Sequence, residues 1–283
     1  MPENSVVLVT GAAEGLGYHT VRQLAVGSTI VIAHARSGDE AAQTRERLLG
    51  SGVDERRLHL AVADFTELRQ VADMANAIAA ACPRIDVLVN NAGTAGAGGR
   101  TVTADGHEQV FQVNYLAPYL LTRLLEDALA ASPVSRVVNV SSSLHRGGRI
   151  NWNDLNFKRR YHRGAAYAQS KLALTMFTTA LTERCPKVRE AVSVHPGILA
   201  TGMLAHYSFR GRPVTDGAEV VARLADPGTR VFNGGYYDGR LPAKASSTAV
   251  DPDAVERLWR ISEKLTFPEK RRARVENELR TGV

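Results

Sequence analysis

The sequence predicts an α/β fold in which helices cover both faces of a doubly wound parallel sheet. Short runs rich in β-branched residues alternate with longer segments of helical periodicity, and a repeated strand–helix order of this kind builds βαβ units. The strand candidates are also apolar almost throughout, as expected of strands that are covered on both faces. We therefore expect a Rossmann-type sheet of about seven strands.

Each predicted element rests on its own residue pattern. Six short apolar runs are strand candidates, at residues 5–10, 29–34, 57–63, 85–90, 135–141 and 189–195. Apolar residues at helical spacing predict helices over residues 17–27, 39–52, 68–81, 107–130 and 167–185. A seventh strand is expected at 230–238 and a closing helix at 252–265.

The order of the elements favours one domain over residues 1–283, because no linker rich in Pro, Gly or Ser and no repeat of solenoid length divides the chain. Two connections, at 142–165 and 198–229, are too long to be simple turns. Both leave the carboxyl end of a strand, where open α/β sheets bind their ligands. We expect these two segments to form the walls and lid of a pocket.

The composition excludes several classes of protein. Hydrophobic residues make up 44% and charged residues 23% of the chain, which is typical of a soluble globular protein. The amino terminus lacks the pattern of a signal peptide, and no run approaches the roughly 20 apolar residues that span a bilayer. We therefore expect a cytoplasmic protein with no membrane partner.

The cysteines and the net charge point to no metal and no nucleic acid. Cys82 and Cys185 are too few for a disulfide framework and lack neighbouring ligands for a metal site. The net charge is +6, and basic residues gather at 157–163 and 269–280. No aromatic platform or DNA-reading motif accompanies them, so we interpret both clusters as solvated surface.

A glycine-rich turn follows the first predicted strand. Gly11, Gly15 and Gly17 lie in "TGAAEGLG", at the start of a helix. Glycine permits a sharp turn and a close approach of a diphosphate, while the exposed N–H groups and the helix dipole favour the anion. The spacing is TGxxxGxG rather than GxGxxG. Tight packing of helix on strand would need the same residues, but the position after a buried strand favours nucleotide binding.

The end of the second strand bears on the choice of nucleotide. A cofactor with an unmodified ribose 2′-OH usually meets an Asp or Glu there, whereas this chain has Arg36 followed by Ser37. A guanidinium fork suits a 2′-phosphate. The pattern favours NADP(H) over NAD, although a surface arginine without a ligand stays open as the alternative.

Seven motifs occur in the order typical of one family: "TGAAEGLG" (10–17), Asp64, "NNAG" (90–93), "VNYL" (113–116), "NVSSS" (139–143), "YAQSK" (167–171) and "PGILAT" (196–201). On these motifs the chain resembles the short-chain dehydrogenase/reductase family in its compact single-domain form. The resemblance implies that Asp64 bonds the adenine edge, that Asn90 and Gly93 lie along the adenosine ribose, and that the "PGILAT" segment holds the nicotinamide amide. With Arg36 and Ser37, the predicted cofactor-binding set is Gly11, Ala13, Glu14, Gly15, Leu16, Gly17, Asp64, Phe65, Asn90, Ala92, Gly93, Tyr167, Lys171, Pro196, Gly197, Ile198 and Thr201.

Tyr167 and Lys171 are the candidate acid–base pair. Residues four apart share one face of a helix, and a nearby cation favours the phenolate, so that the tyrosine becomes a usable general acid or base. Alone, such a pair would indicate a core tyrosine and a surface lysine. The family resemblance adds Ser142, the second serine after "NV", which would bind the reacting oxygen. It also adds Asn114, which would hold a water of the proton relay.

The stretch 139–183 is most similar to the retinol dehydrogenase-like branch, including the 25-residue separation (167 − 142) of Ser142 and Tyr167. That branch interconverts apolar carbonyl compounds and alcohols. Six residues could line an apolar pocket or equally pack within loops: His145, Trp152, Tyr161, Met203, Tyr207 and Phe209.

The sequence thus predicts an NADP(H)-dependent oxidoreductase for a small apolar or aromatic carbonyl substrate. A homodimer or homotetramer formed through helices 107–130 and 167–185 is implied by the same resemblance. Three alternatives stay open: a catalytically silent NADP sensor, a sugar-nucleotide epimerase or dehydratase, and a nucleic-acid-binding protein. The glycine spacing argues against the epimerase, whose turn is normally TGxxGxxG.

Overall fold

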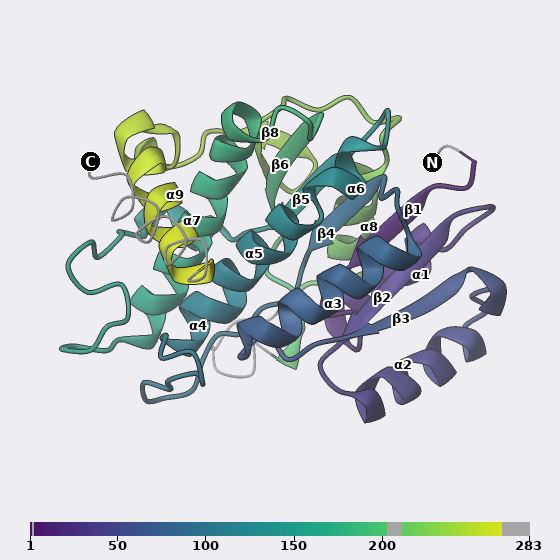
Figure 1. The fold of residues 1–283 in the computed structure, drawn as a ribbon, viewed down its shortest axis with the longest axis horizontal. Helices are drawn as coiled ribbons and strands as arrows, with labels where there is room; N and C mark the ends of the chain where they lie inside the picture. Colours follow the sequence, from purple (N-terminus) through teal and green to yellow (C-terminus); the bar gives the residue numbers. More distant parts are fainter. Residues whose placement is uncertain (2, 203–210, 268–283) are drawn as a thin grey trace, which may run out of the picture.

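The computed structural model describes residues 1, 3–202 and 211–267, and its strands form one central sheet (Figure 1). The strand order is β3-β2-β1-β4-β5-β6-β7-β8. Neighbouring strands are parallel, apart from β8, which is antiparallel to β7. The strands are β1 Val6–Val9, β2 Ile30–Ala35, β3 Leu58–Val62, β4 Val87–Asn90, β5 Arg136–Val140, β6 Glu190–His195, β7 Tyr236–Asp238 and β8 Leu241–Ala243. The predicted α/β fold with a doubly wound sheet is confirmed.

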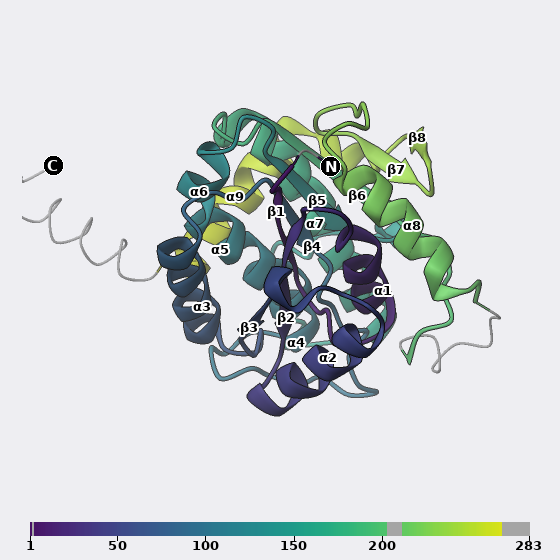
Figure 2. The same cartoon turned by 90° about the vertical axis from the view of Figure 1, so that its right-hand side faces the viewer.

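Helices lie on both faces of the sheet, as the two perpendicular views show (Figures 1 and 2). The α-helices are α1 Gly15–Leu24, α2 Gly38–Gly50, α3 Leu68–Ala81, α4 Gln109–Phe111, α5 Ala117–Leu124, α6 Glu126–Ala130, α7 Arg163–Arg184, α8 Val214–Ala225 and α9 Pro252–Thr266. Short 3₁₀ turns occupy η1 Glu55–Arg57, η3 Ser143–Gly147 and η5 Ser247–Val250, and a π-helical turn occupies η2 Gln112–Leu116.

Two hydrophobic cores lie on opposite sides of the sheet, because successive side chains of a strand point to opposite faces. In β1, Leu8 joins the core formed with α3, α5, α7 and α9. Its neighbours Val7 and Val9 join the second core, which α1 and α8 help to form. The near-continuous apolar strands of the sequence therefore reflect burial on both faces.

The register of the strands brings the predicted motifs to one edge of the sheet. Val9 of β1 pairs with Val89 of β4, and Asn90 of β4 pairs with Asn139 of β5. The strand order reverses between β1 and β4, which is the switch point where such sheets bind ligands. The glycine-rich turn, the "NNAG" segment and the "NVSSS" segment consequently leave the sheet side by side.

The predicted helix over 107–130 is wrong in its continuity. It is divided into α4, η2, α5 and α6. The irregular turn η2 runs directly into α5, because Leu116 keeps a helical backbone, and Pro118 is the second residue of α5. Proline lacks the N–H that would donate to the carbonyl four residues earlier, and that carbonyl belongs to Asn114 in η2.

Other boundaries also differ from the expectation. α7 begins at Arg163, four residues earlier than predicted. The seventh strand covers only Tyr236–Asp238, and the antiparallel β8 that follows it was not predicted. The segment 198–229 is not a lid throughout, because α8 occupies 214–225 and packs on α1. The apolar face of α8 belongs to the core rather than to a pocket.

Candidate active site

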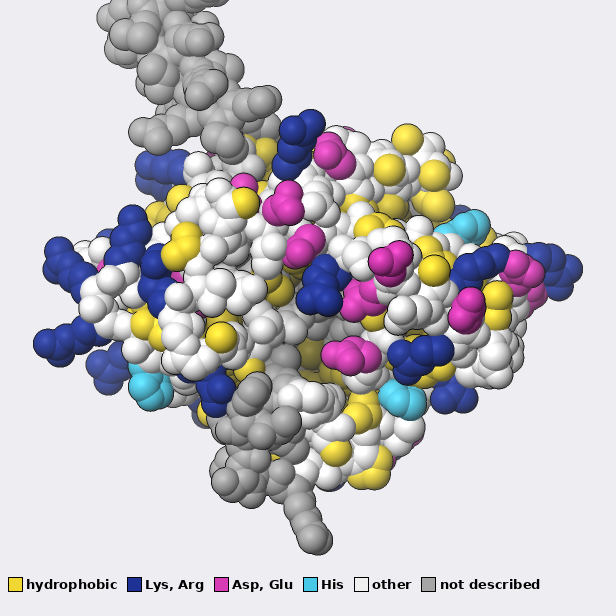
Figure 3. Space-filling model, turned by 90° about the horizontal axis from the view of Figure 1, so that it is seen from below, with side chains coloured by type: hydrophobic (Ala, Val, Ile, Leu, Met, Phe, Trp, Pro, Cys, Tyr) yellow, Lys and Arg dark blue, Asp and Glu magenta, His cyan; other side chains and the backbone are white. Residues whose placement is uncertain are grey.

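A cavity of about 960 Å³ opens at the carboxyl edge of the sheet. Figure 3 views this face and shows a hollow near its centre, with acidic and basic side chains interspersed around it. The predicted residues that line the cavity are Gly11, Ala13, Glu14, Gly15, Leu16, Gly17, Arg36, Asp64, Phe65, Ala92, Gly93, Ser142, Tyr167, Lys171, Pro196, Gly197, Ile198 and Thr201. Predicted residues from six of the seven motifs, together with Arg36, are thus brought to one site.

Several lining residues were not predicted from the sequence. They include His34, Glu40, Asn91, Thr94, Gln109, Val113, Leu144, His195 and Leu199. Three predicted residues, Ser37, Asn90 and Asn114, are absent from the lining. Asn91 and Val113 lie within quoted motifs and Leu144 directly follows one, whereas His34 carried no signal beyond its place near a strand end.

The glycine-rich turn has a conformation that only glycine adopts readily. Gly11 and Gly15 have φ values of +63° and +53°, in the left-handed region. A Cβ atom on Gly17 would lie 2.1 Å from the carbonyl oxygen of Gly11. Asn91 supports the turn, since its Nδ2 donates to the carbonyl oxygens of Thr10 and Gly11 at 2.8 and 3.1 Å. The turn ends where α1 begins, so the first N–H groups of α1 could bind an anion.

His34 braces the same turn from β2. Its Nδ1 accepts from the Gly11 N–H at 2.9 Å, and its Nε2 lies 2.9 Å from the carbonyl oxygen of Ala63. The first bond requires a bare Nδ1, so Nε2 carries the proton and donates to Ala63. The ring stacks on Phe65, with centroids 4.5 Å apart. Burial lowers the pKa of His34 and favours this neutral form.

Arg36 follows the last residue of β2 and presents a mostly exposed guanidinium at the cavity. Its backbone N–H donates to a carboxylate oxygen of Glu40 at 2.5 Å, and its guanidinium lies 3.9 Å from the other oxygen. Ser37 is the N-cap of α2, where its hydroxyl accepts from the Glu40 N–H at 3.3 Å. The hydroxyl of Ser37 is therefore engaged by the helix, which explains its place outside the lining.

Asn90 requires a correction. Its side chain is buried, and its Nδ2 donates to Asn139 Oδ1 at 2.8 Å and to Thr122 Oγ1 at 3.1 Å. It braces β4 against β5 and α5, behind the cavity wall, because alternate strand side chains point away from each other. Gly93 of the same motif does line the cavity.

Lys171 and Tyr167 lie together on α7, with Lys171 Nζ 5.7 Å from the centroid of the tyrosine ring. The lysine side chain is almost fully buried, and its Nζ donates to the carbonyl oxygen of Val140 at 2.8 Å. Burial lowers the pKa of Lys171 to about 8. Helix α7 thus presents a phenol and a weakly acidic ammonium group to one cavity wall.

Two serines of the "NVSSS" motif, Ser141 and Ser142, make different contacts in the structure. Ser141 Oγ lies 3.0 Å from the carbonyl oxygen of Lys171 and 2.8 Å from Thr175 Oγ1, so it joins the end of β5 to α7. Ser142 is the N-cap of η3, and its Oγ accepts from the Leu144 N–H at 3.2 Å. Because an N–H group engages a lone pair of Ser142 Oγ, its hydroxyl proton can be donated into the cavity.

Asn114 is buried in the π-helical turn η2, a type of irregularity frequent at functional sites. Its Oδ1 accepts from the Thr94 N–H at 2.7 Å, and its Nδ2 donates to the Thr94 carbonyl and to Ser170 Oγ at 2.9 and 3.0 Å. A Cβ atom on Gly93 would lie 3.2 Å from Asn114 Oδ1 and 3.4 Å from Lys171 Nζ. Asn114 therefore lies just behind the wall that Gly93 forms beside the lysine, and its water-binding role stays a prediction.

The predicted apolar pocket residues are placed elsewhere. His145, Trp152 and Tyr161 do not line this cavity. The guanidinium carbon of Arg257 lies 4.5 Å from the centroid of the Trp152 ring. Met203, Tyr207 and Phe209 lie outside the described residues. The apolar lining residues outside the predicted cofactor-binding set include Ala95, Val113, Leu144 and Leu199.

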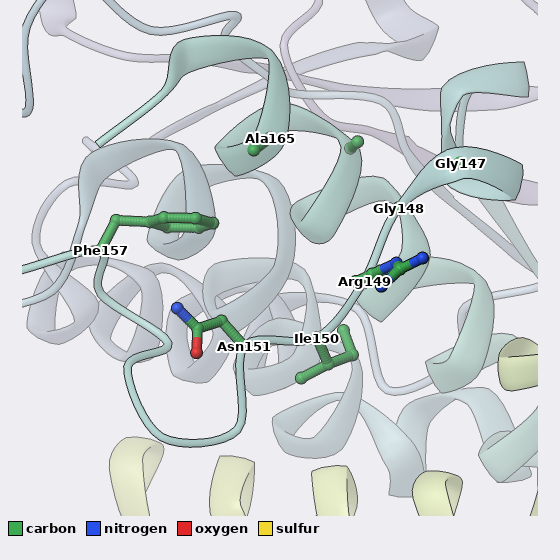
Figure 4. Close-up of a pocket in the computed structure, with 8 residues that line it drawn as sticks. Gly147, Gly148, Arg149, Ile150, Asn151, Phe157 and Ala165 are labelled. Carbon is green, nitrogen blue, oxygen red and sulfur yellow. The ribbon is translucent and has the colours of Figure 1, made fainter. Parts of the chain in front are cut away.

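A second, smaller cavity of about 410 Å³ lies within the segment 147–168 (Figure 4). Gly148, Ile150, Asn151 and Phe157 are among its lining residues. The predicted pocket segment 142–165 thus contributes to two separate cavities, and only its first residues reach the larger one.

Within the described part of the chain, no group of three or more His, Cys, Asp or Glu residues could hold a metal ion. A search of those same residues finds no helix with the length and apolar character needed to cross a bilayer.

Comparison with known proteins identifies the family. Residues 5–209 match the family model described as short chain dehydrogenase. The chain belongs to the short-chain dehydrogenase family. Within this family it falls in the retinol dehydrogenase-like branch, since retinol dehydrogenase 14 of Mus musculus is 35% identical over 282 residues, covering 91% of this chain and 84% of the relative.

Two further similar proteins widen the comparison within the short-chain dehydrogenases. A protein of Streptomyces sp. (strain C5), provisionally assigned as a daunorubicin C-13 ketoreductase, is 37% identical over 269 residues. The match covers 90% of this chain and 90% of that protein. The crystal structure of a metagenomic short-chain oxidoreductase in complex with NADP is 27% identical, with a TM-score of 0.60, over 81% of this chain and 92% of that one. These relatives are named as a dehydrogenase, a ketoreductase and an oxidoreductase, which supports the assignment of this chain to an oxidoreductase family.

Proposed function

We propose that this short-chain dehydrogenase is an NADP(H)-dependent enzyme that interconverts an apolar or aromatic carbonyl compound and its alcohol, with Tyr167 as the acid–base residue. The observation that carries the proposal is the meeting of Tyr167, Lys171 and Ser142 in the cavity that the glycine-rich turn also lines. A proton donor, a cation and a hydroxyl thus line the same cavity as the turn that would bind the nucleotide carrying the hydride.

The residues at the cavity fit a dinucleotide. The left-handed glycines and the start of α1 offer N–H groups to a diphosphate. Arg36 would take the 2′-phosphate, and the segment 196–201 would hold the nicotinamide amide. When bound, the nicotinamide supplies or accepts the hydride. The NADP found in the metagenomic relative supports the same choice of cofactor.

The protein's own residues would manage the proton and the charge. In the reductive direction Tyr167 gives its phenol proton to the carbonyl oxygen, and in the oxidative direction the phenolate removes a proton from the alcohol. Ser142 donates a hydrogen bond to the same oxygen as charge develops and keeps its own proton. Lys171 favours the phenolate between turnovers, since an ammonium group nearby stabilises the anion.

The apolar lining supports the substrate class. Val113, Leu144 and Leu199 present hydrocarbon surface at the cavity, which is the kind of surface that holds an apolar ligand. Two relatives are named for retinol, an apolar alcohol, and for a ketone of daunorubicin. We therefore assign the enzyme an apolar or aromatic aldehyde or ketone.

The decisive experiment follows NADPH absorbance with a panel of aromatic and long-chain aldehydes and ketones, and NADP reduction with the matching alcohols. Turnover of apolar members with NADPH, and slower turnover with NADH, is expected. NADPH binding without turnover of any member would contradict the proposal and favour a silent sensor. Turnover restricted to polar or charged carbonyl compounds would contradict the substrate class alone.

A further inference from the structure

His145 lies behind the candidate catalytic serine without reaching the cavity. Its side chain has 0% exposure, and it lines neither of the two cavities described above. It is part of η3, the short turn that Ser142 caps and that packs against α7. His145 therefore cannot touch a substrate, yet it belongs to the turn that orients one of the proposed catalytic groups.

Both ring nitrogens of His145 are engaged, and their partners define its form. Nδ1 lies 2.7 Å from the carbonyl oxygen of Ser142, and Nε2 accepts from the Ser246 N–H at 3.2 Å. Since Nε2 receives a hydrogen bond, Nδ1 carries the proton and donates it to Ser142. Burial lowers the pKa of His145, which favours this neutral form.

The carbonyl oxygen of Ser142 thus receives two hydrogen bonds from one residue. The backbone N–H of His145 donates to it at 3.1 Å, in addition to the ring. The side chain of Ser142 is also held, because its Oγ accepts a hydrogen bond from the Leu144 N–H at 3.2 Å. Together these bonds hold the backbone and the hydroxyl of Ser142 in one orientation at the cavity wall.

The His145 ring is in turn held by the carboxyl-terminal part of the sheet. It packs on the Tyr236 ring of β7, with centroids 4.4 Å apart. The neighbouring Arg146 donates to the Lys244 carbonyl at 3.2 Å and lies 3.2 Å from an Asp238 carboxylate oxygen. The segment 236–246 therefore lies directly behind the turn that carries Ser142.

We propose that His145 is a positioning residue that holds Ser142 in its proton-donating orientation and couples it to the segment 236–246 through the Ser246 N–H. This inference rests on the proposed function, because it gives Ser142 a role in the reaction. Loss of the His145 bond to Ser142 should lower kcat by about tenfold, a change within the range expected for one hydrogen bond. The affinity for NADPH should be unchanged, because no proposed cofactor contact is altered.

Two substitutions of His145 separate its two bonds. In His145→Gln the side-chain amide can reach the Ser246 N–H but not the Ser142 carbonyl, whereas in His145→Asn the amide N–H takes the place of Nδ1–H. We expect kcat to fall about tenfold in H145Q and clearly less in H145N. Equal activity of H145Q and wild type would overturn the proposal.

A double-mutant cycle with Ser142→Ala distinguishes positioning from a general structural role. If His145 acts through Ser142, H145Q should lower kcat by less than about twofold in the S142A background. An undiminished tenfold loss in that background would overturn the proposal. Wild-type enzyme that turns over no carbonyl compound would instead reject the proposed function itself.

The coupling to the carboxyl-terminal segment has its own test. Ser246 has a φ of −56°, close to the value that proline adopts, so Ser246→Pro removes the N–H donor with little change of backbone. Ser246→Ala keeps the N–H and is the matched control. We expect S246P alone to lower kcat severalfold at unchanged NADPH affinity. Equal kcat values for the two variants would overturn the coupling.

Discussion

The two ends of the cavity are built in different ways. At the glycine-rich end the chemistry comes from backbone N–H groups, and the conformation depends on Gly11, Gly15 and Gly17 within seven residues of sequence. At the catalytic end it comes from side chains on separate elements: Ser142 at the N-cap of η3 and the pair Tyr167 and Lys171 on α7. The first end is a local backbone structure, and the second is an assembly of distant segments.

This difference determines how each end is supported. Side chains from outside the turn, those of His34, Arg47 and Asn91, hydrogen-bond to its backbone. The catalytic end needs a network of buried polar groups, including the bond of Lys171 to the Val140 carbonyl and that of Asn114 to Thr94. A substitution at the first end should therefore act on cofactor affinity, and one at the second end on turnover.

The largest expected effect is at the catalytic end. Tyr167→Phe removes the proton that the reaction needs, so kcat should fall by about 10²–10⁴-fold. The Kd for NADPH, measured by fluorescence titration, should change less than about twofold, because the ring is kept. Tyr161→Phe is the matched control, since Tyr161 does not line the cavity. Turnover close to wild type in Y167F would contradict the assignment of Tyr167 as the acid–base residue.

The converse test is at the glycine-rich end. Gly17→Ala places a Cβ atom 2.1 Å from the Gly11 carbonyl oxygen, so the turn must shift at a cost of about 1–3 kcal/mol. If that cost falls on binding, the Kd for NADPH rises roughly 5- to 150-fold. Gly50→Ala is the control, because no atom lies within 4 Å of its Cβ position. A G17A enzyme with unchanged NADPH affinity but lost turnover would abolish the distinction between the two ends.

A smaller effect is expected at Arg36. Arg36→Asp replaces a guanidinium fork with a carboxylate that repels a 2′-phosphate and can accept from a ribose 2′-OH. The ratio of the Kd values for NADPH and NADH should shift by about tenfold or more toward NADH. Arg69→Asp, on the exposed face of α3, is the control. If the ratio is the same in R36D and wild type, another residue determines the choice of nucleotide.

The smallest effect concerns stability in acid. The pKa of His34 is lowered in the folded protein by burial, so below its ordinary value of about 6.5 the unfolded chain binds a proton that the folded chain does not. The free energy of unfolding should therefore fall as the pH drops below about 6.5, and His34 adds at most about 1.4 kcal/mol per pH unit to this slope.

Urea unfolding of wild type and His34→Asn between pH 7.5 and 4.5 measures that contribution. The amide oxygen of the substituted side chain can still accept from the Gly11 N–H but does not titrate, so the variant should show a shallower slope. Identical slopes would mean that His34 is not held neutral by the fold, and the support it gives to the turn would need another explanation.

Much of the fold could be predicted from the sequence, because buried parallel strands and amphipathic helices have characteristic patterns. The breaks in the 107–130 segment could not, since the π-helical turn at 112–116 places Asn114 among partners that come from 94 and 170. Helix α8 was missed within a segment interpreted as a lid. The short antiparallel β8 has only three residues, too few for a periodic signal.

The sequence by itself determined what depends on adjacent residues: the left-handed glycine turn after a strand, and the shared helix face of Tyr167 and Lys171. Only the tertiary structure decided which neighbouring side chain faces the cavity. Asn90 faces the core, while Asn91 lines the cavity. The tertiary structure also buries Lys171, which lowers its pKa to about 8, and it places His145 and Ser246 behind Ser142. The physical reason is that backbone conformation and helix spacing are local, whereas burial and hydrogen-bond partners come from residues distant in the chain.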